Sequence, residues 1–412
     1  MIKIKLLIFS TIVLLLFMIG ISKAFAQYKG SFYNNYNLDS NKIGLLYLDI
    51  DNINFFKNNE FLGEKISGYT LPGFILKPKL SLQLSRKIKV EAGFNLLHFW
   101  GADEYPSSYY YSTIAEWKTK NYQDGFHATP IFTAQIELAK NLHLVLGSFH
   151  RNNNHNLITP LYNNEINISS DPESGIQLLY NSKYFSLDSW LNWHNFMFKN
   201  NAEQESFTFC LSTNSKILNT DKLELYIPIQ WVVRHYGGEI DTTPNMKTET
   251  YMNMDIGLGV KYKIDKKYIK SYGFDINYAI YNSNCNSTLK KGYGIFPRIF
   301  MENNDYRFNL GYWVSEDFLP ILGSAHFGNI STKIPDLIFN KMSMIYSSIE
   351  YTYKYHKNYS LGFDIEYYHY LPYSYNVSNI EYKNKIGKNS FSIGLYLRLN
   401  PRFKLLKVNL DS

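Results

Sequence analysis

Long hydrophobic runs are almost absent from this sequence. Residues 6–19 are apolar, but after Ile19 no run of about 18 apolar residues follows, so the rest of the chain is expected to contain no membrane-spanning helix. Charged residues are also few, at 19%, and both signs are interspersed. This excludes the basic patches of nucleic-acid-binding proteins. The two cysteines, Cys210 and Cys285, lie in such different contexts that two thiols are favoured over a disulfide.

The usual motifs of soluble enzymes are missing too. There is no P-loop, no dinucleotide-binding fingerprint, and no HExxH or Cys/His spacing for zinc. Histidines are scattered singly, apart from His150 and His155. Acidic residues such as Asp51, Asp171 and Glu173 could bind calcium, but solvated loop carboxylates are the simpler interpretation. We therefore expect no cofactor and no metal.

The N-terminus is typical of an exported protein. Lys3 and Lys5 precede the apolar stretch, and Ala24-Phe25-Ala26 forms a small-x-small cleavage site. Residues 1–26 are therefore predicted to be a cleaved signal peptide used by the Sec pathway. No cysteine follows the cleavage site, which excludes a lipoprotein.

Alternation with a period of two is the main signal in the mature chain, which is rich in tyrosine (36 in the whole sequence). Between residues 223 and 234, Leu223, Leu225, Ile227, Ile229, Trp231 and Val233 alternate with Glu224, Tyr226, Gln230 and Arg234. About a dozen residues with one apolar face can cross a bilayer as a tilted strand. The pattern recurs in about sixteen segments (range about 14–18) and predicts an all-β fold, a transmembrane up-and-down antiparallel β-barrel.

The connections alternate between short turns and long polar loops, which suits periplasmic turns and extracellular loops. The long segments are 101–127, 151–173, 235–250, 282–292, 316–340 and 371–388. The first strand is predicted at 43–50, the first outer loop at 51–73 and the sixteenth strand at 389–399. Residues 27–412 would form one domain, with a short periplasmic tail at 400–412.

The polar face of each strand is expected to line the lumen. The lumen-lining candidates are Lys89, Glu91, Glu137, Glu224, Arg234, Lys261, Asp275, Arg298, Arg307, Asp364, Glu366 and Arg398. Their signs are balanced, so no ion selectivity is indicated. About sixteen strands leave an aqueous interior, although charges pairing across the lumen, together with an infolded loop, could close it.

Two long loops carry apolar centres that are costly to leave in water. Segment 151–173 contains His155, Leu157 and Tyr162, and segment 316–340 contains Phe318 and Phe327. Both segments are candidates for a constriction or plug, although contact with lipid or a partner would also cover them.

Aromatic residues near the ends of the up-going strands predict an interfacial girdle. They are Phe99, Trp100, Trp193, Trp231, Tyr312, Trp313, Tyr367, Tyr368 and Tyr370. The last predicted strand carries Ser392, Gly394, Leu397 and Leu399, which is similar to the insertion signal read by the barrel-assembly machinery.

Known outer-membrane hydrolases give only weak matches. His155 precedes Ser169, Ser170, Asp171 and Glu173, but the run His155-Asn156-Leu157 lacks the Ser and Gly of the phospholipase motif His-x-Ser-Asn-Gly. For an omptin-like protease, Asp103-Glu104 and Glu239/Asp241 beside His235 offer residue types only. The sequence therefore predicts no enzyme and no catalytic residue.

The sequence resembles uncharacterised outer-membrane β-barrel proteins of Bacteroidota. The resemblance rests on segments 68–73, 154–158, 160–162, 171–175, 190–193 and 204–207. It implies a barrel in the outer membrane and brings no established activity. We predict a porin-like channel for passive diffusion of small hydrophilic solutes. The alternative is a closed barrel with a structural or partner-binding role through its loops, and a lipid hydrolase comes third. The expected partners are outer-membrane lipid and lipopolysaccharide, the barrel-assembly machinery and small hydrophilic solutes, with no nucleic acid.

Overall fold

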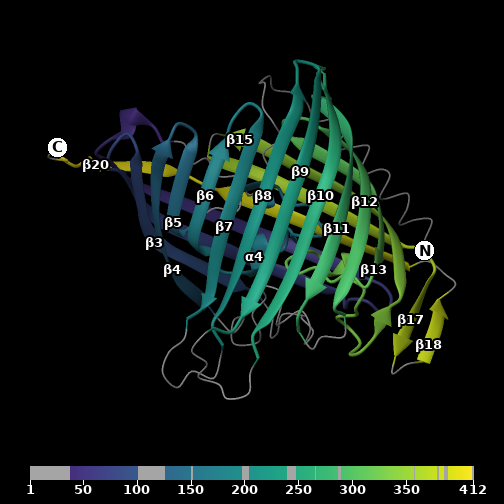
Figure 1. The fold of residues 1–412 in the computed structure, drawn as a ribbon. Coiled ribbons are helices and arrows are strands. Elements are labelled where there is room, and N and C mark those ends of the chain that lie inside the picture. The colour runs from purple at the N-terminus through teal and green to yellow at the C-terminus, as the bar shows by residue number, and fades with distance from the viewer. Residues whose placement is uncertain are drawn as a thin grey trace.

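A computed structural model describes residues 38–100, 126–149, 152–196, 204–238, 247–264, 266–285, 289–356, 358–377, 380–384 and 388–410. The predicted signal peptide lies outside these ranges. Sixteen long strands dominate the fold (Figure 1). They are β1 (Leu45–Phe61), β2 (Tyr69–Gln83), β3 (Ile88–Phe99), β4 (Phe126–Ala139), β5 (Leu142–Ser148), β6 (Ser174–Asn181), β7 (Phe185–Asn195), β8 (Ser206–Asn219), β9 (Leu223–Tyr236), β10 (Glu249–Lys263), β11 (Ser271–Ser283), β12 (Lys291–Glu302), β13 (Tyr306–Glu316), β15 (Lys341–His356), β16 (Tyr359–Tyr370) and β19 (Lys388–Leu399).

Shorter elements lie between these strands or at the chain ends. They are the helical turns η1 (Ser40–Lys42), η2 (Asn152–Asn156), α4 (Ile166–Ser169) and η3 (Ala325–Phe327), and the strands β14 (Ile338–Phe339), β17 (Tyr373–Val377), β18 (Ile380–Asn384) and β20 (Arg402–Lys407). Within the described residues, no helix is long and apolar enough to span a membrane.

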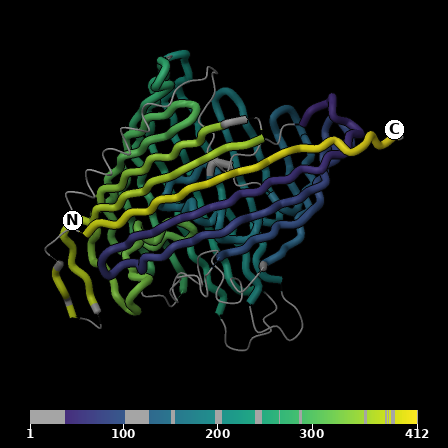
Figure 2. Tube along the Cα trace, turned by 180° about the vertical axis from the view of Figure 1, so that it is seen from behind, coloured from purple at the N-terminus to yellow at the C-terminus, as the bar shows by residue number. Residues whose placement is uncertain are grey.

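The sheet closes on itself, which confirms the predicted barrel. Each long strand pairs antiparallel with the next, and β19 pairs with β1 from Asn52↔Leu399 to Phe61↔Ser390. Figure 2 shows the last strand in yellow running beside purple β1. Closure pairs the backbone groups that an open sheet edge would leave unsatisfied in lipid.

The predicted first strand, residues 43–50, is too short, and the predicted first loop, 51–73, is too long. Residues 51–61 belong to β1 and residues 69–73 to β2, so only 62–68 form the outer connection. The reason is that β1 is polar on both faces. Asp51 and Lys57 lie on its inner side, while Asn52 and Asn54 lie on its outer side, and a strand without apolar alternation is difficult to distinguish from a loop.

Residues after the closing strand continue the sheet. In β20, Arg402 lies opposite Asp49 of β1, and their side chains form an ion pair with an Nε–Oδ1 distance of 2.6 Å. A second Arg402 nitrogen donates to the Ser81 hydroxyl. The segment predicted as a tail therefore contains a strand that covers the periplasmic end of β1.

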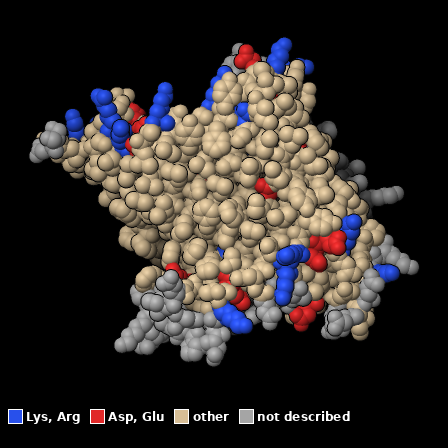
Figure 3. Space-filling view, viewed as in Figure 1, with Lys and Arg blue, Asp and Glu red and all other residues tan. Residues whose placement is uncertain are grey.

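The outer surface carries the expected apolar band. Figure 3 shows charged side chains gathered at the two ends of the barrel, with a broad, nearly uncharged zone between them. Large apolar side chains that are exposed on the strands include Phe132, Ile256, Leu258 and Leu395. Such a band, flanked by polar ends, matches the hydrocarbon core of a bilayer.

Inward-facing glycines make room for aromatic rings. A Cβ placed on Gly294 of β12 would overlap the indole ring of Trp313 on β13. Glycines covered in this way by a neighbouring ring are a known device for building curved sheets. The Trp313 ring is fully buried and cannot swing into solvent.

We expect Gly294→Ala to lower the free energy of unfolding by about 1–3 kcal/mol, because the added methyl overpacks a filled site. Urea unfolding of the refolded barrel measures this. Ser347→Ala, on the outward face of β15, is the control and should change the stability little. Equal stability of the two variants would show that the Trp313 ring can move aside.

Candidate functional site

Two loops fill the outer half of the lumen. We call residues 152–173 the first plug loop and residues 317–340 the second plug loop. Their buried residues include Leu157, Ile158, Leu161, Tyr162, Phe318, Leu319, Ile321, Leu322 and Phe327. The loops meet in a parallel bridge between Tyr162 and Leu322, and the Ser324 N–H donates to Thr159 O. The constriction candidates His155, Leu157, Tyr162, Phe318 and Phe327 all lie in this plug.

Wall side chains hold the plug by bonding to its backbone. Gln230 accepts from the Ile158 N–H and donates to Asn156 O. Asn253 donates to Leu319 O and accepts from the Ile321 N–H. Because buried loop backbone otherwise lacks hydrogen-bond partners, these two amides explain how irregular segments are tolerated inside the barrel.

The predicted aromatic girdle is only partly correct. Trp100, Trp193, Tyr312 and Tyr367 are exposed on the outer face. Phe99, Trp313, Tyr368 and Tyr370 instead point inward and are buried against the plug. Trp313 Nε1 donates to Phe327 O of the second plug loop at 3.0 Å. Adjacent aromatic residues in one strand must face opposite ways, so half of these pairs had to point inward.

His155 anchors the first plug loop to the wall. Its Nδ1 lies 2.7 Å from Asp188 Oδ2 on β7, its Nε2 lies 2.9 Å from Glu173 Oε2, and its ring stacks on Trp190. Burial alone would lower the pKa of His155, but the two carboxylates outweigh burial and raise the pKa to about 9. With both ring nitrogens engaged, His155 is a structural cation. It therefore has no free nitrogen to act as the base of a phospholipase-like site.

Replacing His155 should lower the free energy of unfolding by an amount that depends on pH. The folded pKa of about 9 lies above the ordinary value of 6.5, so the stabilisation is complete below about pH 6.5 and is lost as pH rises through about 9. It amounts to about 3 kcal/mol. We expect the stability difference between wild type and His155→Gln, measured by urea unfolding, to be large at pH 7 and to shrink at pH 10. A difference independent of pH would contradict the charged state, and His98→Gln is the control.

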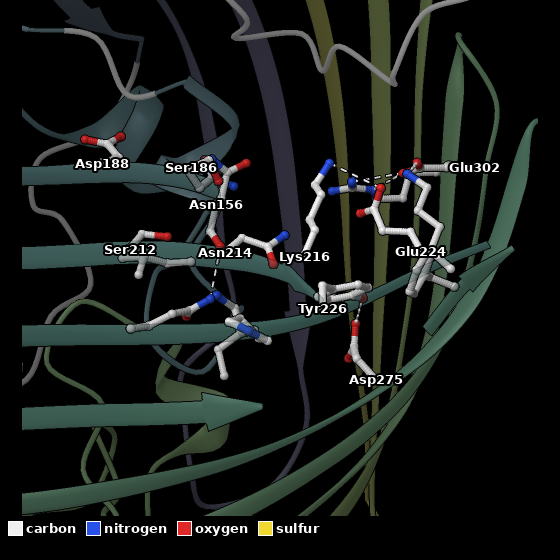
Figure 4. A pocket seen from close by; sticks show the side chains of 18 of the residues that line it. Asn156, Ser186, Asp188, Ser212, Asn214, Lys216, Glu224, Tyr226, Asp275 and Glu302 are labelled. Atoms are coloured by element: carbon white, nitrogen blue, oxygen red, sulfur yellow. Dashed lines mark hydrogen bonds and ion pairs between the residues drawn. The ribbon is translucent and has the colours of Figure 1, made fainter. Parts of the chain in front are cut away.

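The inner half of the lumen is an open cavity of about 960 Å³ (Figure 4). Residues at the short turns, including Asn141, Asn181 and Asn303, line its mouth. The first plug loop, from Asn154 to Asn164, contributes to its other end. The cavity therefore faces the periplasm.

All predicted lumen-lining residues lie on the inner face of the sheet, and most of them form ion pairs. Glu91 binds Lys79 and Lys89, Arg298 binds Asp275, Arg307 and Lys261 bind Glu302, and Arg398 binds Asp51. Lys216 and Lys263 bind Glu224, and Asp364 and Glu366 flank Lys57. Arg234 donates to Thr208 Oγ1, and Glu137 lies near the β4–β5 turn.

Sequence reasoning missed several of these partners, including Lys216 and Lys263. Asp51 and Lys57 fell in the segment predicted as a loop, and Glu302 was placed at the edge of a turn. Asp51 and Lys57 point inward because β1 continues to Phe61. Glu302 points inward as the last residue of β12. Asp51 and Glu173 are thus not solvated loop acids. Asp103, Glu104, Glu239 and Asp241 lie outside the described residues. Within the described ranges, no cluster of three or more His, Cys, Asp or Glu could hold a metal, and no disulfide joins Cys210 to Cys285.

A polar row interrupts the lipid-facing surface where the barrel closes. We call it the polar seam. It consists of Asn52, Asn54, Asn58 and Glu60 on β1, Thr70 on β2, Tyr367 and His369 on β16, and Asn389 on β19. Its members form separate bonded groups on β1/β2 and on β16/β19, and the exposed apolar residues Phe391, Ile393 and Leu395 of β19 lie between them. Asn54 Nδ2 donates to Asn52 Oδ1 at 2.6 Å, and Thr70 Oγ1 donates to Asn58 Oδ1 at 2.7 Å. Polar side chains facing lipid are costly and mark functional positions.

The outer end of the seam contains an oriented histidine. His369 lies directly opposite Asn389, and its Nδ1 is 2.7 Å from Asn389 Oδ1. The Tyr367 hydroxyl donates to the same oxygen at 2.7 Å. Because an amide oxygen can only accept, Nδ1 must carry the proton, which leaves the Nε2 lone pair available. The pair lies one residue from the end of β16, on the side of the barrel that carries the long loops.

A second accessible histidine lies at the barrel mouth. His127 Nε2 is 2.8 Å from Asp171 Oδ1, both side chains are partly exposed, and the Thr129 hydroxyl donates to the same carboxylate at 3.4 Å. His127 shares its strand face with the inward residues of β4, so it faces the mouth above the plug rather than the surrounding lipid.

The sequence matches a family model described as "Lipid A 3'-O-deacylase-type" over residues 38–408. The chain belongs to the lipid A 3'-O-deacylase-type family. The match covers the whole barrel, including both plug loops and the polar seam. The finding overturns the prediction that the protein is not an enzyme, because the family is an enzyme family.

Solved structures give weaker similarities. OccAB2 of Acinetobacter baumannii has a TM-score of 0.48 at 12% identity, covering 89% of this chain and 100% of that one. OccAB3 of the same organism has a TM-score of 0.47 at 10% identity, covering 87% of this chain and 99% of that one. OpdL of Pseudomonas aeruginosa has a TM-score of 0.46 at 8% identity, covering 88% of this chain and 99% of that one. Such values assign no function to this chain, and no curated protein matches it.

Membership of the lipid A 3'-O-deacylase-type family agrees with the barrel's apolar band. This family member is an outer-membrane protein, as the sequence predicted. The resemblance to Bacteroidota proteins stays a prediction.

Proposed function

We propose that this protein is an outer-membrane esterase that removes an ester-linked acyl chain from lipid A, with His369 as its general base. The observation that carries the proposal is the His369–Asn389 pair on the lipid-facing wall. Lipid A lies in the outer leaflet, and its ester groups sit between the sugar head group and the hydrocarbon. A base that is to reach them must face lipid near the outer end of the strands, and His369 does both.

The chemistry requires few groups. Nε2 of His369 accepts a proton from water while the water oxygen attacks the ester carbonyl. The tetrahedral intermediate then collapses, and the imidazolium returns the proton to the leaving sugar oxygen. The products are a free fatty acid and a lipid A hydroxyl. Asn389 acts as a positioning residue, because its Oδ1 holds the Nδ1–H tautomer, and its Nδ2 is a donor for the carbonyl oxygen.

The lower seam suits the same substrate. Asn58 and Glu60 lie on β1, next to β19, and Thr70 lies opposite Asn58 on β2, so a second polar group stands across β19 from His369. Amide and hydroxyl groups there can bond to the amide and hydroxyl groups that lipid A acyl chains carry near the sugar. The rest of the band offers mainly apolar contacts for the hydrocarbon.

Incubating the refolded barrel with lipid A tests the proposal. Mass spectrometry should show lipid A lighter by one acyl chain, together with the matching free fatty acid. Urea-unfolded protein is the control. Intact lipid A after prolonged incubation with folded protein, in the presence and absence of divalent cations, would contradict the assignment.

The predicted passive channel is the second candidate, supported by the 960 Å³ periplasmic cavity. The plug loops occupy the outer half of the same lumen, which argues against free diffusion. The expected roles of lipopolysaccharide and of the barrel-assembly machinery as partners are proposals of the same kind.

A further inference from the structure

The periplasmic cavity is separate from the lipid-facing seam. It lies inside the barrel, it opens at the end opposite to the outer leaflet, and none of its lining residues belongs to the polar seam. Lipid A cannot occupy it from the outer leaflet. Its volume of about 960 Å³ lies within the range of ligand-binding pockets, on the order of 300–1,000 Å³.

The charges of its wall are largely neutralised by one another. Glu224 lies 3.2 Å from Lys216 and 3.4 Å from Lys263. Arg298 forms a two-point contact with Asp275, at 3.1 and 2.8 Å. Paired charges of this kind offer little net attraction to an anion or a cation. The cavity therefore favours an uncharged ligand.

The remaining lining is rich in neutral hydrogen-bonding groups. It contains nine asparagines. Some of their amides bond to protein groups, as Asn277 does to Asp275 and Asn309 to Ser348. In Figure 4, Asn156, Ser186, Ser212 and Asn214 gather on one side, while the ion-paired Lys216, Glu224 and Glu302 lie on the other. Carboxamides both donate and accept, which matches the hydroxyl groups of a sugar.

Aromatic rings provide flat apolar surfaces beside these amides. Tyr226 projects from β9, and its ring occupies the space above Gly259, where a Cβ would overlap it. Its hydroxyl donates to Asp275 Oδ2 at 3.2 Å, which fixes the ring orientation. Phe300 and Tyr346 line the same cavity. Rings with a fixed orientation can pack against the apolar faces of pyranose units.

We propose that this cavity binds an uncharged oligosaccharide of about two or three units that enters from the periplasm. The ligand chemistry could come from N-acetylated glycan strands or from simple hexose oligomers. The inference does not rest on the proposed lipid A activity, because no residue is shared between the two sites.

Titration calorimetry on the refolded mature barrel in detergent tests the inference with two probes, chitotriose and maltotriose. We expect saturable binding of at least one probe. Preference for chitotriose would point to N-acetylated glycan strands, and preference for maltotriose to hexose oligomers. Asn214→Leu and Tyr226→Ala should each weaken binding at least tenfold. Asn282→Leu, on the outward side of β11, is the matched control and should not change it.

Folding of each variant is checked by the heat-dependent shift in gel mobility typical of barrels. His369→Ala should leave sugar binding unchanged, so failure of the esterase and failure of the sugar site can be told apart. Absence of saturable binding for both probes would overturn the proposal. So would equal binding by wild type and both folded cavity variants, or equal binding of a triuronate, which is charged.

Discussion

His369→Ala should lower the rate of lipid A deacylation by about 10²–10⁴-fold, which is the usual contribution of a positioned general base. The imidazole is oriented by the Asn389 amide at 2.7 Å, and alanine removes the group that takes the proton from water. Release of fatty acid from lipid A, followed by mass spectrometry, measures the rate. Binding of lipid A to the barrel should change little, so the loss should fall on kcat rather than KM.

Two histidine controls make this result specific. His98→Ala removes another outward histidine, which lies among Phe74 and Trp100, and should leave the rate unchanged. His127→Ala removes the pair with Asp171 at the mouth. If His127→Ala abolishes activity and His369→Ala does not, the base lies at the barrel mouth, and the assignment to the seam is wrong.

The positioning role of Asn389 has its own signature. Asn389→Asp should still orient His369 but should also stabilise the imidazolium, so the base would titrate at higher pH. We therefore expect the acidic limb of the pH–rate profile to move to higher pH, with activity retained above it. An unchanged profile would show that the two side chains are not coupled during catalysis.

Shortening both plug loops should convert a closed barrel into an open pore. Replacing residues 154–168 and 318–337 by short Gly-Ser linkers removes the buried cluster around Leu161 and Phe327. A barrel of sixteen strands leaves an aqueous lumen once nothing fills it. We expect stable single-channel steps in planar bilayers from the shortened protein, and far smaller or no steps from the wild type.

A matched deletion separates plug removal from general damage. The β17–β18 hairpin, residues 373–384, projects beyond the barrel wall (Figure 1) and pairs with β14, which the shortened second loop would keep. Deleting it should not raise conductance. Large steps from the wild-type barrel would instead mean that solutes pass around the plug, and would favour the passive-channel candidate.

Much of the fold could be read from the sequence because strand alternation is a local property. Side chains two residues apart share a face, so the inward positions of Glu224, Asp275 and Arg398 were predictable without knowing any neighbour. The same rule located β19. The rule failed at β1, because Asn52 and Asn54 face lipid there and the strand lacks the alternation of apolar and polar residues. That failure coincides with the polar seam, because the asparagine side chains there depart from the lipid-facing apolar pattern.

The candidate sites depend on which strands are neighbours, and the sequence does not state this. His369 meets Asn389 only because β16 pairs with β19 in one register. His155 lies between Glu173 and Asp188 only because its loop folds inward. No motif spacing records such contacts, and it was the family match that overturned the prediction that the protein is not an enzyme.

The sequence by itself determined a membrane barrel with a polar inner wall, since period-two alternation and strand length are set by local chemistry and bilayer thickness. The tertiary structure decided the rest. It packed the two long loops into the lumen because burying Leu161, Phe318 and Phe327 there removes them from water. It also closed β1 against β19, which placed polar residues of β1 and β16 on either side of β19, whose outward face is mostly apolar.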